Sequence, residues 1–172
     1  GDGGNSGFDA TDPHFRFHTY TGGQMDVNYN DFDPNTWLFI GDRFLVNFPE
    51  GQRFYAAVIS DPLHTKTIFH GAQSVWRTSN GGGDRAFLEA HCNVASIIGE
   101  DPNNLLFTGA CGTPGDWPKL GTSTLTNNAP GPNPPASPYG TTKGGSTISS
   151  LARANDDGTM WASTGAGRLF IS

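Results

Sequence analysis

Two acidic residues in glycine-rich segments are the first candidates for chemistry in this 172-residue chain. Asp2 lies within Gly1–Gly4, and glycines let backbone and side chain approach a ligand closely. Glu50 precedes Arg53, whose charge favours an ionised carboxylate. Glycoside hydrolysis uses two carboxylates across a cleft, one as general acid and one as base or nucleophile. Solvated loop charges beside turn glycines have the same pattern, so this alternative stays open.

Motifs for metal, cofactor or nucleophile chemistry are incomplete. The five histidines show no metal-ligand spacing, and we predict no metal site. Asp31–Asp33 and Asn155–Gly158 carry oxygen ligands suited to Ca²⁺, yet neither completes an EF-hand loop. Turn capping is therefore their expected role, and no cofactor is predicted. The chain has no Gly-x-Ser-x-Gly elbow, and Gly81–Gly83 lacks the Lys-Ser/Thr pair of a phosphate loop.

The composition favours an all-β chain with many short strands. It contains 24 Gly, 12 Pro and 12 Phe, and only 15% of the residues are charged, which suits strands joined by tight turns. The net charge of −6 argues against a nucleic-acid partner, which needs clustered Lys and Arg. No apolar run approaches the length of about 20 residues that a membrane span needs.

A pattern of short strands recurs three times along the chain. The clearest unit runs from Phe54 to Leu120 and shares an Asp-Pro turn, Asp61-Pro62, with Asp33-Pro34 in a weaker unit that covers Phe8 to Val46. A third unit begins at Ser146. Apolar runs bounded by turn residues predict strands. The predicted strands are a buried one at 54–59, then 67–71, 74–78 and an exposed edge strand at 116–120 in the middle unit, and 147–152, 159–162 and 168–172 in the third unit.

Two insertions interrupt this pattern within what we expect to be a single all-β domain over residues 1–172. Residues 83–115 hold both cysteines, Cys92 and Cys111, and a bridge between them would stabilise the fold by roughly 3 kcal/mol. We predict this disulfide, with two buried thiols as the alternative, and a disulfide implies an oxidising, extracytoplasmic setting. Residues 127–145 hold five prolines, which favours an extended surface loop.

The middle unit resembles the BNR or Asp-box repeats of sialidase-like propellers. The resemblance rests on Asp61-Pro62, on residues 67–71 and on the run 75–82. The Asp box is Ser/Thr-x-Asp-x-Gly-x-Thr-Trp; Thr78 takes the hydroxyl position, Asn80 stands for the aspartate, Gly82 matches, and the Thr-Trp ending is missing. In such a turn a short polar side chain folds back onto backbone N–H groups, so these three residues are predicted to be structural. In pattern the whole chain is similar to secreted bacterial glycosyl-hydrolase-like proteins.

The resemblance implies β-propeller-type blades of four antiparallel strands, of which this chain holds about two and a half. Further blades would come from the same longer chain or from other chains. It also implies that the loops leading into the innermost strands meet near a central axis. Those loops would bring Asp2 and Glu50 together as candidate catalytic residues, with Arg53 and Lys143 as candidate substrate-binding residues.

Two functions from different classes fit these features. The first is an extracellular sialidase-like propeller that acts on or binds carbohydrate, as a glycoside hydrolase if the axial-loop carboxylates are catalytic. The alternative is a non-catalytic extracellular module that binds glycans or surface proteins, or that builds a surface assembly. A secreted location is expected for both.

Overall fold

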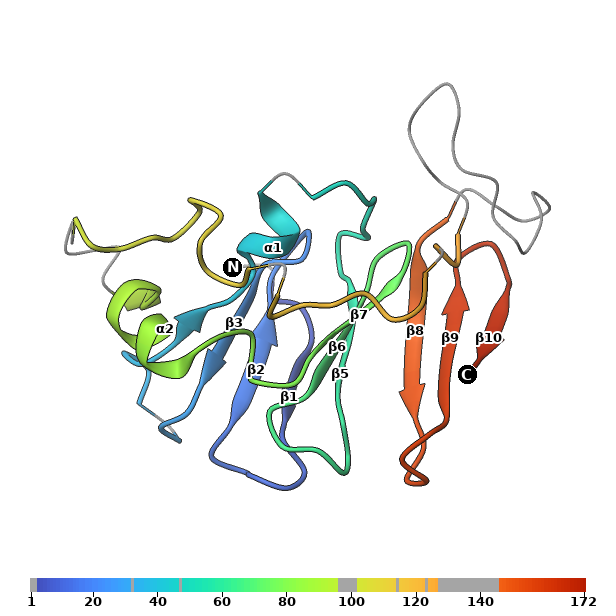
Figure 1. Cartoon of the computed structure of the whole chain (residues 1–172), viewed down its shortest axis with the longest axis horizontal. Helices are drawn as coiled ribbons and strands as arrows, with labels where there is room; N and C mark the ends of the chain where they lie inside the picture. Colours follow the sequence, from blue (N-terminus) through green and yellow to red (C-terminus); the bar gives the residue numbers. More distant parts are fainter. Residues whose placement is uncertain are drawn as a thin grey trace.

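The computed structural model contains three small antiparallel β-sheets, formed one after another along the chain (Figure 1). It describes residues 3–31, 33–46, 48–95, 102–113, 115–122, 124–126 and 146–172. Within these residues the all-β expectation is confirmed, with two helices of four and seven residues beside the sheets. No described helix is both long enough and apolar enough to cross a membrane.

Each sheet is a meander in which every strand pairs with the one before it. Sheet A contains β1 (Ser6–Phe8), β2 (Arg16–Thr19), β3 (Met25–Asn28) and β4 (Leu38–Phe39). Sheet B contains β5 (Ala57–Ser60), β6 (Ile68–Gly71) and β7 (Val75–Thr78). Sheet C contains β8 (Ile148–Arg153), β9 (Met160–Thr164) and β10 (Leu169–Ile171). The first three strands predicted for the middle unit and all three of the third unit are present, each with bounds shifted by a few residues.

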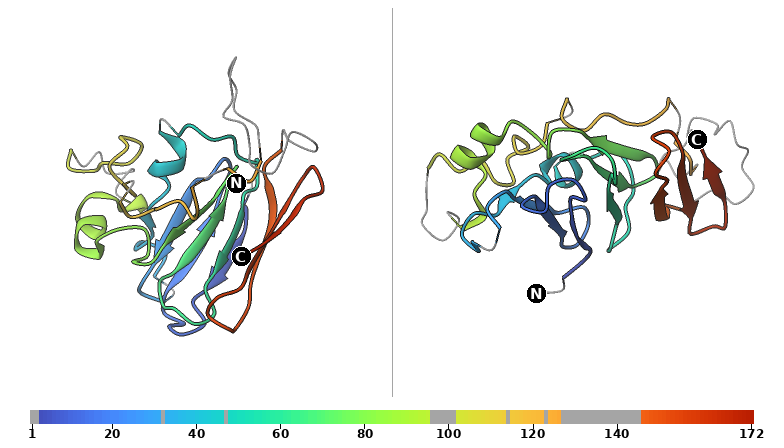
Figure 2. Two further views of the ribbon diagram at one scale, coloured as in Figure 1. Left: turned by 45° about the vertical axis from the view of Figure 1, so that its right-hand side comes forward. Right: turned by 90° about the horizontal axis from the view of Figure 1, so that it is seen from below.

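The first strands of the three sheets lie next to one another, since β5 contacts both β1 and β8. The sheets therefore follow one another along the long axis of the molecule (Figures 1 and 2). The strands β1, β5 and β8 begin at one end of the molecule, which we call the strand-start end. The turns that follow these three strands lie together at the opposite end, which we call the hairpin end (Figure 1).

Apolar side chains fill the spaces between successive sheets. The larger cluster includes Phe17 and Val27 of sheet A together with Val58 and Ile68 of sheet B, and Trp117 is fully buried in it. A smaller cluster joins sheet B to sheet C, with Phe69 and Ile148 among its members. Successive side chains of a strand point to opposite faces of its sheet, so in β6, which is buried throughout, Ile68 enters the larger cluster and Phe69 the smaller one.

The insertion between β7 and sheet C is attached to the edge of sheet A. Cys92 and Cys111 form the predicted disulfide. Residue 38 of β4 pairs with residue 93 of the insertion, and the Phe39 N–H donates to the Cys92 carbonyl at 2.7 Å. Before this contact the insertion forms α2 (Arg85–His91), a helix that the strand pattern did not predict. The other helix, α1 (Asp42–Leu45), follows β4 and was also unpredicted.

Three details of the expected pattern are wrong. Phe54 and Tyr55 are exposed rather than buried, because β5 begins only at Ala57. The segment 116–120 pairs with β7 through one isolated bridge, yet its Trp117 is buried, because its ring packs against Phe44. The turns Asp61-Pro62 and Asp33-Pro34 are not equivalent, because they follow the first strand of sheet B and the third strand of sheet A, respectively.

Candidate functional site

Glu50, a predicted catalytic residue at the strand-start end, is bound to donors of its own chain. Its carboxylate accepts hydrogen bonds from the Ser74 N–H at 2.8 Å, the Ser74 hydroxyl at 2.9 Å and the Trp76 indole N–H at 3.2 Å. The Arg43 guanidinium lies 4.6 Å from the centroid of the Trp76 ring and interacts electrostatically with Glu50. Glu50 therefore holds the β6–β7 turn and fixes the loop before β5.

The other predicted site residues are only partly described by the structure. Asp2 and Lys143 lie outside the described residues. Arg53 is exposed, and no ion pair among the described residues joins it to Glu50. It is followed by an exposed aromatic pair, Phe54 and Tyr55, whose rings meet edge to face at 4.9 Å.

The Asp-box-like turn after β7 is closed by its own side chains. The Thr78 hydroxyl accepts a hydrogen bond from the Gly82 N–H at 2.8 Å and donates one to the Asn80 side-chain oxygen at 2.8 Å. The Asn80 amide in turn donates to Asp116 at 3.0 Å, which ties the turn to the segment that pairs with β7. These bonds fix the backbone and leave Thr78 buried.

Three aspartates at the hairpin end cap the turns that follow the first strands; two of them directly follow their strand, and the third lies three residues beyond the end of β8. They are Asp9, Asp61 and Asp156, and each follows the first strand of its sheet. In each case Oδ1 accepts hydrogen bonds from the N–H groups two and three residues later. The second oxygen reaches the next sheet in two cases: Asp9 accepts from the Lys66 N–H, and Asp61 accepts from Arg153 at 3.1 Å. A carboxylate thus caps each turn, and in two cases it also joins the neighbouring sheet.

Four ionisable side chains form a connected network between sheets B and C at the hairpin end. The buried Asp61 carboxylate pairs with the guanidinium of Arg153, whose side chain is 10% exposed. His64 lies between two carboxylates, with Nδ1 3.2 Å from Asp61 and Nε2 3.3 Å from Asp157. Arg153 also contacts Asp157 at 3.3 Å, which closes the network. Every member therefore has its orientation fixed by at least two others.

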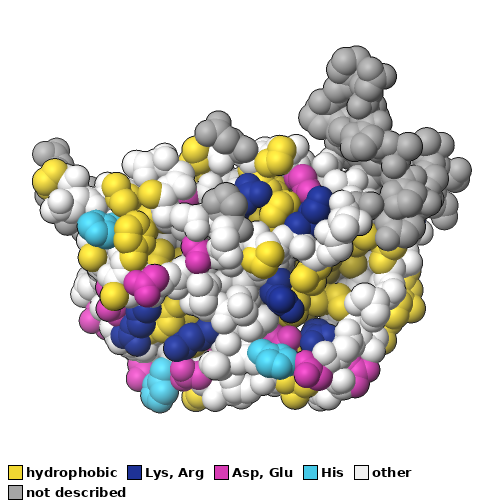
Figure 3. All heavy atoms as spheres, in the orientation of Figure 1, with side chains coloured by type: hydrophobic (Ala, Val, Ile, Leu, Met, Phe, Trp, Pro, Cys, Tyr) yellow, Lys and Arg dark blue, Asp and Glu magenta, His cyan; other side chains and the backbone are white. Residues whose placement is uncertain are grey.

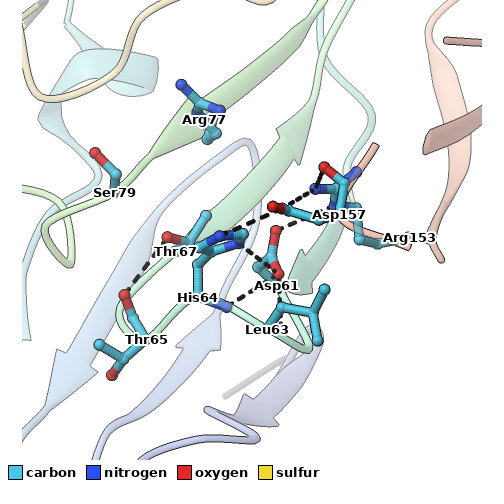
Figure 4. A pocket seen from close by; sticks show the side chains of 9 residues that line it. All are labelled: Asp61, Leu63, His64, Thr65, Thr67, Arg77, Ser79, Arg153 and Asp157. Carbon is cyan, nitrogen blue, oxygen red and sulfur yellow. Dashed lines mark hydrogen bonds and ion pairs between the residues drawn. The ribbon is translucent and has the colours of Figure 1, made fainter. Parts of the chain in front are cut away.

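This network forms one wall of an open cavity of about 590 Å³, which we call the network cavity. Figure 4 shows the network residues on one side and Arg77 and Ser79 apart from them, nearer β7. The Arg77 side chain is exposed, and no described carboxylate forms an ion pair with it. Charged side chains of both signs and histidine gather at this lower edge of the molecule in Figure 3. The lining residues are Asp61, Leu63, His64, Thr65, Thr67, Arg77, Ser79, Arg153 and Asp157.

The electrostatics of the network favour an ionised Asp61. Burial raises the pKa of Asp61, but hydrogen bonds from the Leu63 N–H, Arg153 and His64 outweigh this and leave the pKa below its usual value. The cavity lining carries two aspartates and two arginines, whose charges balance, together with His64. The cavity can therefore offer fixed acceptors and donors to a polar ligand, with one guanidinium, that of Arg77, outside the network.

The described residues contain no group of three or more His, Cys, Asp or Glu side chains that could hold a metal ion. Comparisons with protein-family models, curated proteins and solved structures returned no match.

The strand pattern did not identify the network cavity. Its residues are distributed over 61–67, 77–79 and 153–157, and no spacing in the sequence joins these segments. One signal was present: Asp9 directly follows the first strand of sheet A, as Asp61 does in sheet B. Aligning Asp61 with Asp9 instead of Asp33 would have identified the repeated turn carboxylate.

Proposed function

We propose that the chain is an extracellular, β-propeller-type module that binds carbohydrate in the network cavity and does not hydrolyse it. The blade-like arrangement is supported by three successive meanders whose first strands lie next to one another. A closed propeller has about four to eight blades, so this proposal requires further blades from a longer chain or from other chains. The disulfide supports an oxidising, extracellular setting.

The observation that carries the binding proposal is the orientation of the polar groups before any ligand arrives. Asp61, His64 and Arg153 hold one another in an open cavity, so little side-chain freedom remains to be lost on binding. The more exposed side chains of the network, His64 and Asp157, are the groups that can bind the hydroxyls of a sugar ring. Arg77 offers a guanidinium without a described acidic partner, and a guanidinium pairs well with a carboxylate. The sugar we expect is therefore acidic.

Binding without hydrolysis is favoured by the state of the carboxyl groups. A glycosidase needs a general acid whose pKa is raised so that it is protonated at working pH. Among the described carboxyls that depart from their usual pKa, Asp9, Asp61 and Asp156 are shifted downward. Burial raises the pKa of Asp42, but this residue has no exposed surface and accepts hydrogen bonds from Gly109 and Cys111.

A glycan array that includes neutral, uronate-bearing and sialylated oligosaccharides tests this proposal. Each glycan that binds is then incubated with the protein, and its reducing ends are analysed. We expect an acidic glycan to bind without cleavage, and Arg77→Ala to weaken binding at least about tenfold through loss of a charge-assisted pair. A matched control is Tyr55→Ala, in the aromatic pair at the opposite end. Cleavage of a bound glycan would favour the hydrolase, and a loss confined to Tyr55→Ala would place the site at the strand-start end.

A further inference from the structure

His64 is the only histidine among the described residues that line the network cavity, and both of its ring nitrogens face carboxylates. Nδ1 lies 3.2 Å from an Asp61 oxygen and Nε2 lies 3.3 Å from an Asp157 oxygen (Figure 4). A neutral imidazole carries one N–H and one lone pair, whereas the protonated ring carries two N–H groups. A neutral ring therefore directs its lone pair at one of the two carboxylates, and only the ring with two protons attracts both.

The two carboxylates around His64 differ in their freedom to respond. Asp61 is buried, and the Leu63 N–H and Arg153 fix its two oxygens. The side chain of Asp157 is 63% exposed and that of His64 is 51% exposed. The ring can therefore exchange a proton with solvent without any opening of the fold, and Asp157 is the carboxylate that can turn away from a neutral ring.

A proton on His64 also decides the net charge of the cavity lining. The two other acidic and two basic side chains of the lining balance in formal charge; they are Asp61, Asp157, Arg77 and Arg153. With a neutral imidazole the lining carries no net charge, and with a protonated one it carries a single positive charge. Arg77, across the cavity, has no ion pair with a described carboxylate, so the added charge is not offset there.

The other ionisable groups of the neighbouring turns keep a constant charge. Asp9 of sheet A accepts a hydrogen bond from the Lys66 N–H, two residues from His64, and the Lys66 ammonium lies 5.6 Å from the centroid of an aromatic ring of sheet A. Burial raises the pKa of Asp9, but hydrogen bonds to its carboxylate outweigh this and leave the pKa below its usual value. Hydrogen bonds from Thr159 lower the pKa of Asp156 in the β8–β9 turn to about 2. Both carboxylates are therefore ionised above about pH 5.

We propose that a proton on His64 strengthens the binding of an acidic sugar in the network cavity, so that affinity rises as the pH falls from about 8 to about 5.5. The inference rests on the proposed carbohydrate-binding function and adds the regulation of that site. Histidine ordinarily changes its charge within this range of pH. The additional positive charge attracts the carboxylate of the sugar, and by linkage the bound carboxylate favours the proton on the ring.

The test compares two methyl glycosides that differ in one carboxylate. Methyl β-D-glucuronide is ionised throughout this pH range, and methyl β-D-glucoside is neutral. Each is titrated into the ¹⁵N-labelled chain at about pH 5.5 and about pH 8, and the amide shifts of Thr65 and Ser79 give the dissociation constants. We expect the glucuronide to bind at least about threefold more tightly at the lower pH, and the affinity for the glucoside to change by less than about 1.5-fold.

His64→Gln tests whether this pH dependence comes from the proposed residue. Glutamine is a polar side chain of similar reach that does not titrate, so the ratio of the two glucuronide dissociation constants should fall below about 1.5. His91→Gln, on α2 and outside the cavity lining, is the matched control and should retain the ratio of the parent. The amide spectra of both variants verify that the sheets remain folded.

The possible failures of the inference and of the proposed function differ. A glucuronide affinity that is equal at the two pH values, or a ratio that His64→Gln retains, would overturn the inference and leave carbohydrate binding in place. An equal pH dependence for the glucoside would also overturn it, because the effect would not depend on the charge of the sugar. Failure of both glycosides to bind the parent at either pH would contradict the proposed function and the inference with it.

Discussion

The two ends of the three sheets both present acidic residues, but they use them differently. At the strand-start end, the Glu50 carboxylate accepts three hydrogen bonds from Ser74 and Trp76 and holds a neighbouring turn in place. At the hairpin end, Asp61 also caps its own turn, but its second oxygen pairs with Arg153 beside an open cavity. One carboxylate is part of the internal framework, and the other is part of a framework that borders a ligand-sized space.

This difference shows that residue type and nearby charge do not identify a site by themselves. Glu50 has an arginine three residues away in sequence, yet its hydrogen-bond donors come from residues 74 and 76. Asp61 resembles an ordinary turn residue in sequence, but the sheet arrangement places Arg153, ninety-two residues later, against it. The partners that a carboxylate acquires on folding, rather than its neighbours in sequence, decide which part of the structure it holds in place.

The largest expected effect comes from removing the carboxylate at the hairpin end. Asp61→Ala leaves the nearly buried Arg153 without its main partner and removes the cap of the β5–β6 turn. We expect a loss of about 3–5 kcal/mol in the free energy of unfolding, measured by urea denaturation. Asp157→Ala, whose side chain is 63% exposed, is the matched control and should lose less than about 1 kcal/mol. Equal losses of unfolding free energy in the two variants would contradict the larger structural role that we assign to Asp61.

Removal of the disulfide tests whether the insertion, which is attached to sheet A, stabilises the fold without affecting the network cavity. The double variant Cys92→Ala/Cys111→Ala removes the cross-link between residues 19 apart in sequence. We expect a loss of about 3 kcal/mol in the free energy of unfolding. Glycan affinity at the opposite side of sheet B should stay within about twofold of the parent. A much weaker glycan affinity in a folded variant would mean that the insertion contributes to binding.

His70 gives the loop at the strand-start end a pH dependence. Burial lowers the pKa of His70 to about 3, and Nε2 lies 3.1 Å from the Gln52 side-chain oxygen. Between the unfolded value of about 6.5 and this folded value, the unfolded chain binds a proton that the folded chain excludes. Stability from this group is therefore complete above about pH 6.5 and falls by about 1.4 kcal/mol per pH unit below it.

Urea denaturation between about pH 6.5 and 4.5 measures this slope, since carboxyl groups contribute mainly below that range. His70→Leu should flatten the slope, because the unfolded chain then has one proton fewer to bind. An unchanged slope in His70→Leu would show that another group is responsible.

The smallest expected effect is at Glu50. Glu50→Gln weakens charge-assisted bonds to Ser74 and to the Trp76 indole, and should lower the free energy of unfolding by about 1–2 kcal/mol. Glycan affinity should remain unchanged, because Glu50 does not line the network cavity. Thermal denaturation and glycan titration of the same variant give both readouts. If the parent chain cleaves a bound glycan and the folded Glu50→Gln variant does not, Glu50 would be catalytic.

Much of the fold followed from local patterns, whereas the candidate site did not. Apolar runs such as 67–71 and 147–152, each ended by turn residues, predicted strands because their period and their breakers are local properties. The Cys92–Cys111 pair was predictable because the chain has only two cysteines. The exposure of Phe54 and Tyr55 could not be predicted, because an aromatic pair next to Ala-Ala-Val-Ile continues the strand pattern. The His64 network depends on the packing of sheet C against sheet B, which no local pattern contains.

The most direct measurement of the central claim is ¹H–¹⁵N correlation NMR of the labelled chain during titration with the acidic glycan that binds best. We predict saturable shifts of the backbone amides of His64, Thr65, Ser79 and Asp157, which line the network cavity. The amides of Gln52 and Tyr55 at the opposite end should stay in place. Shifts confined to residues 50–55, with the amides of the network cavity unchanged, would contradict the account and place carbohydrate binding at the strand-start end.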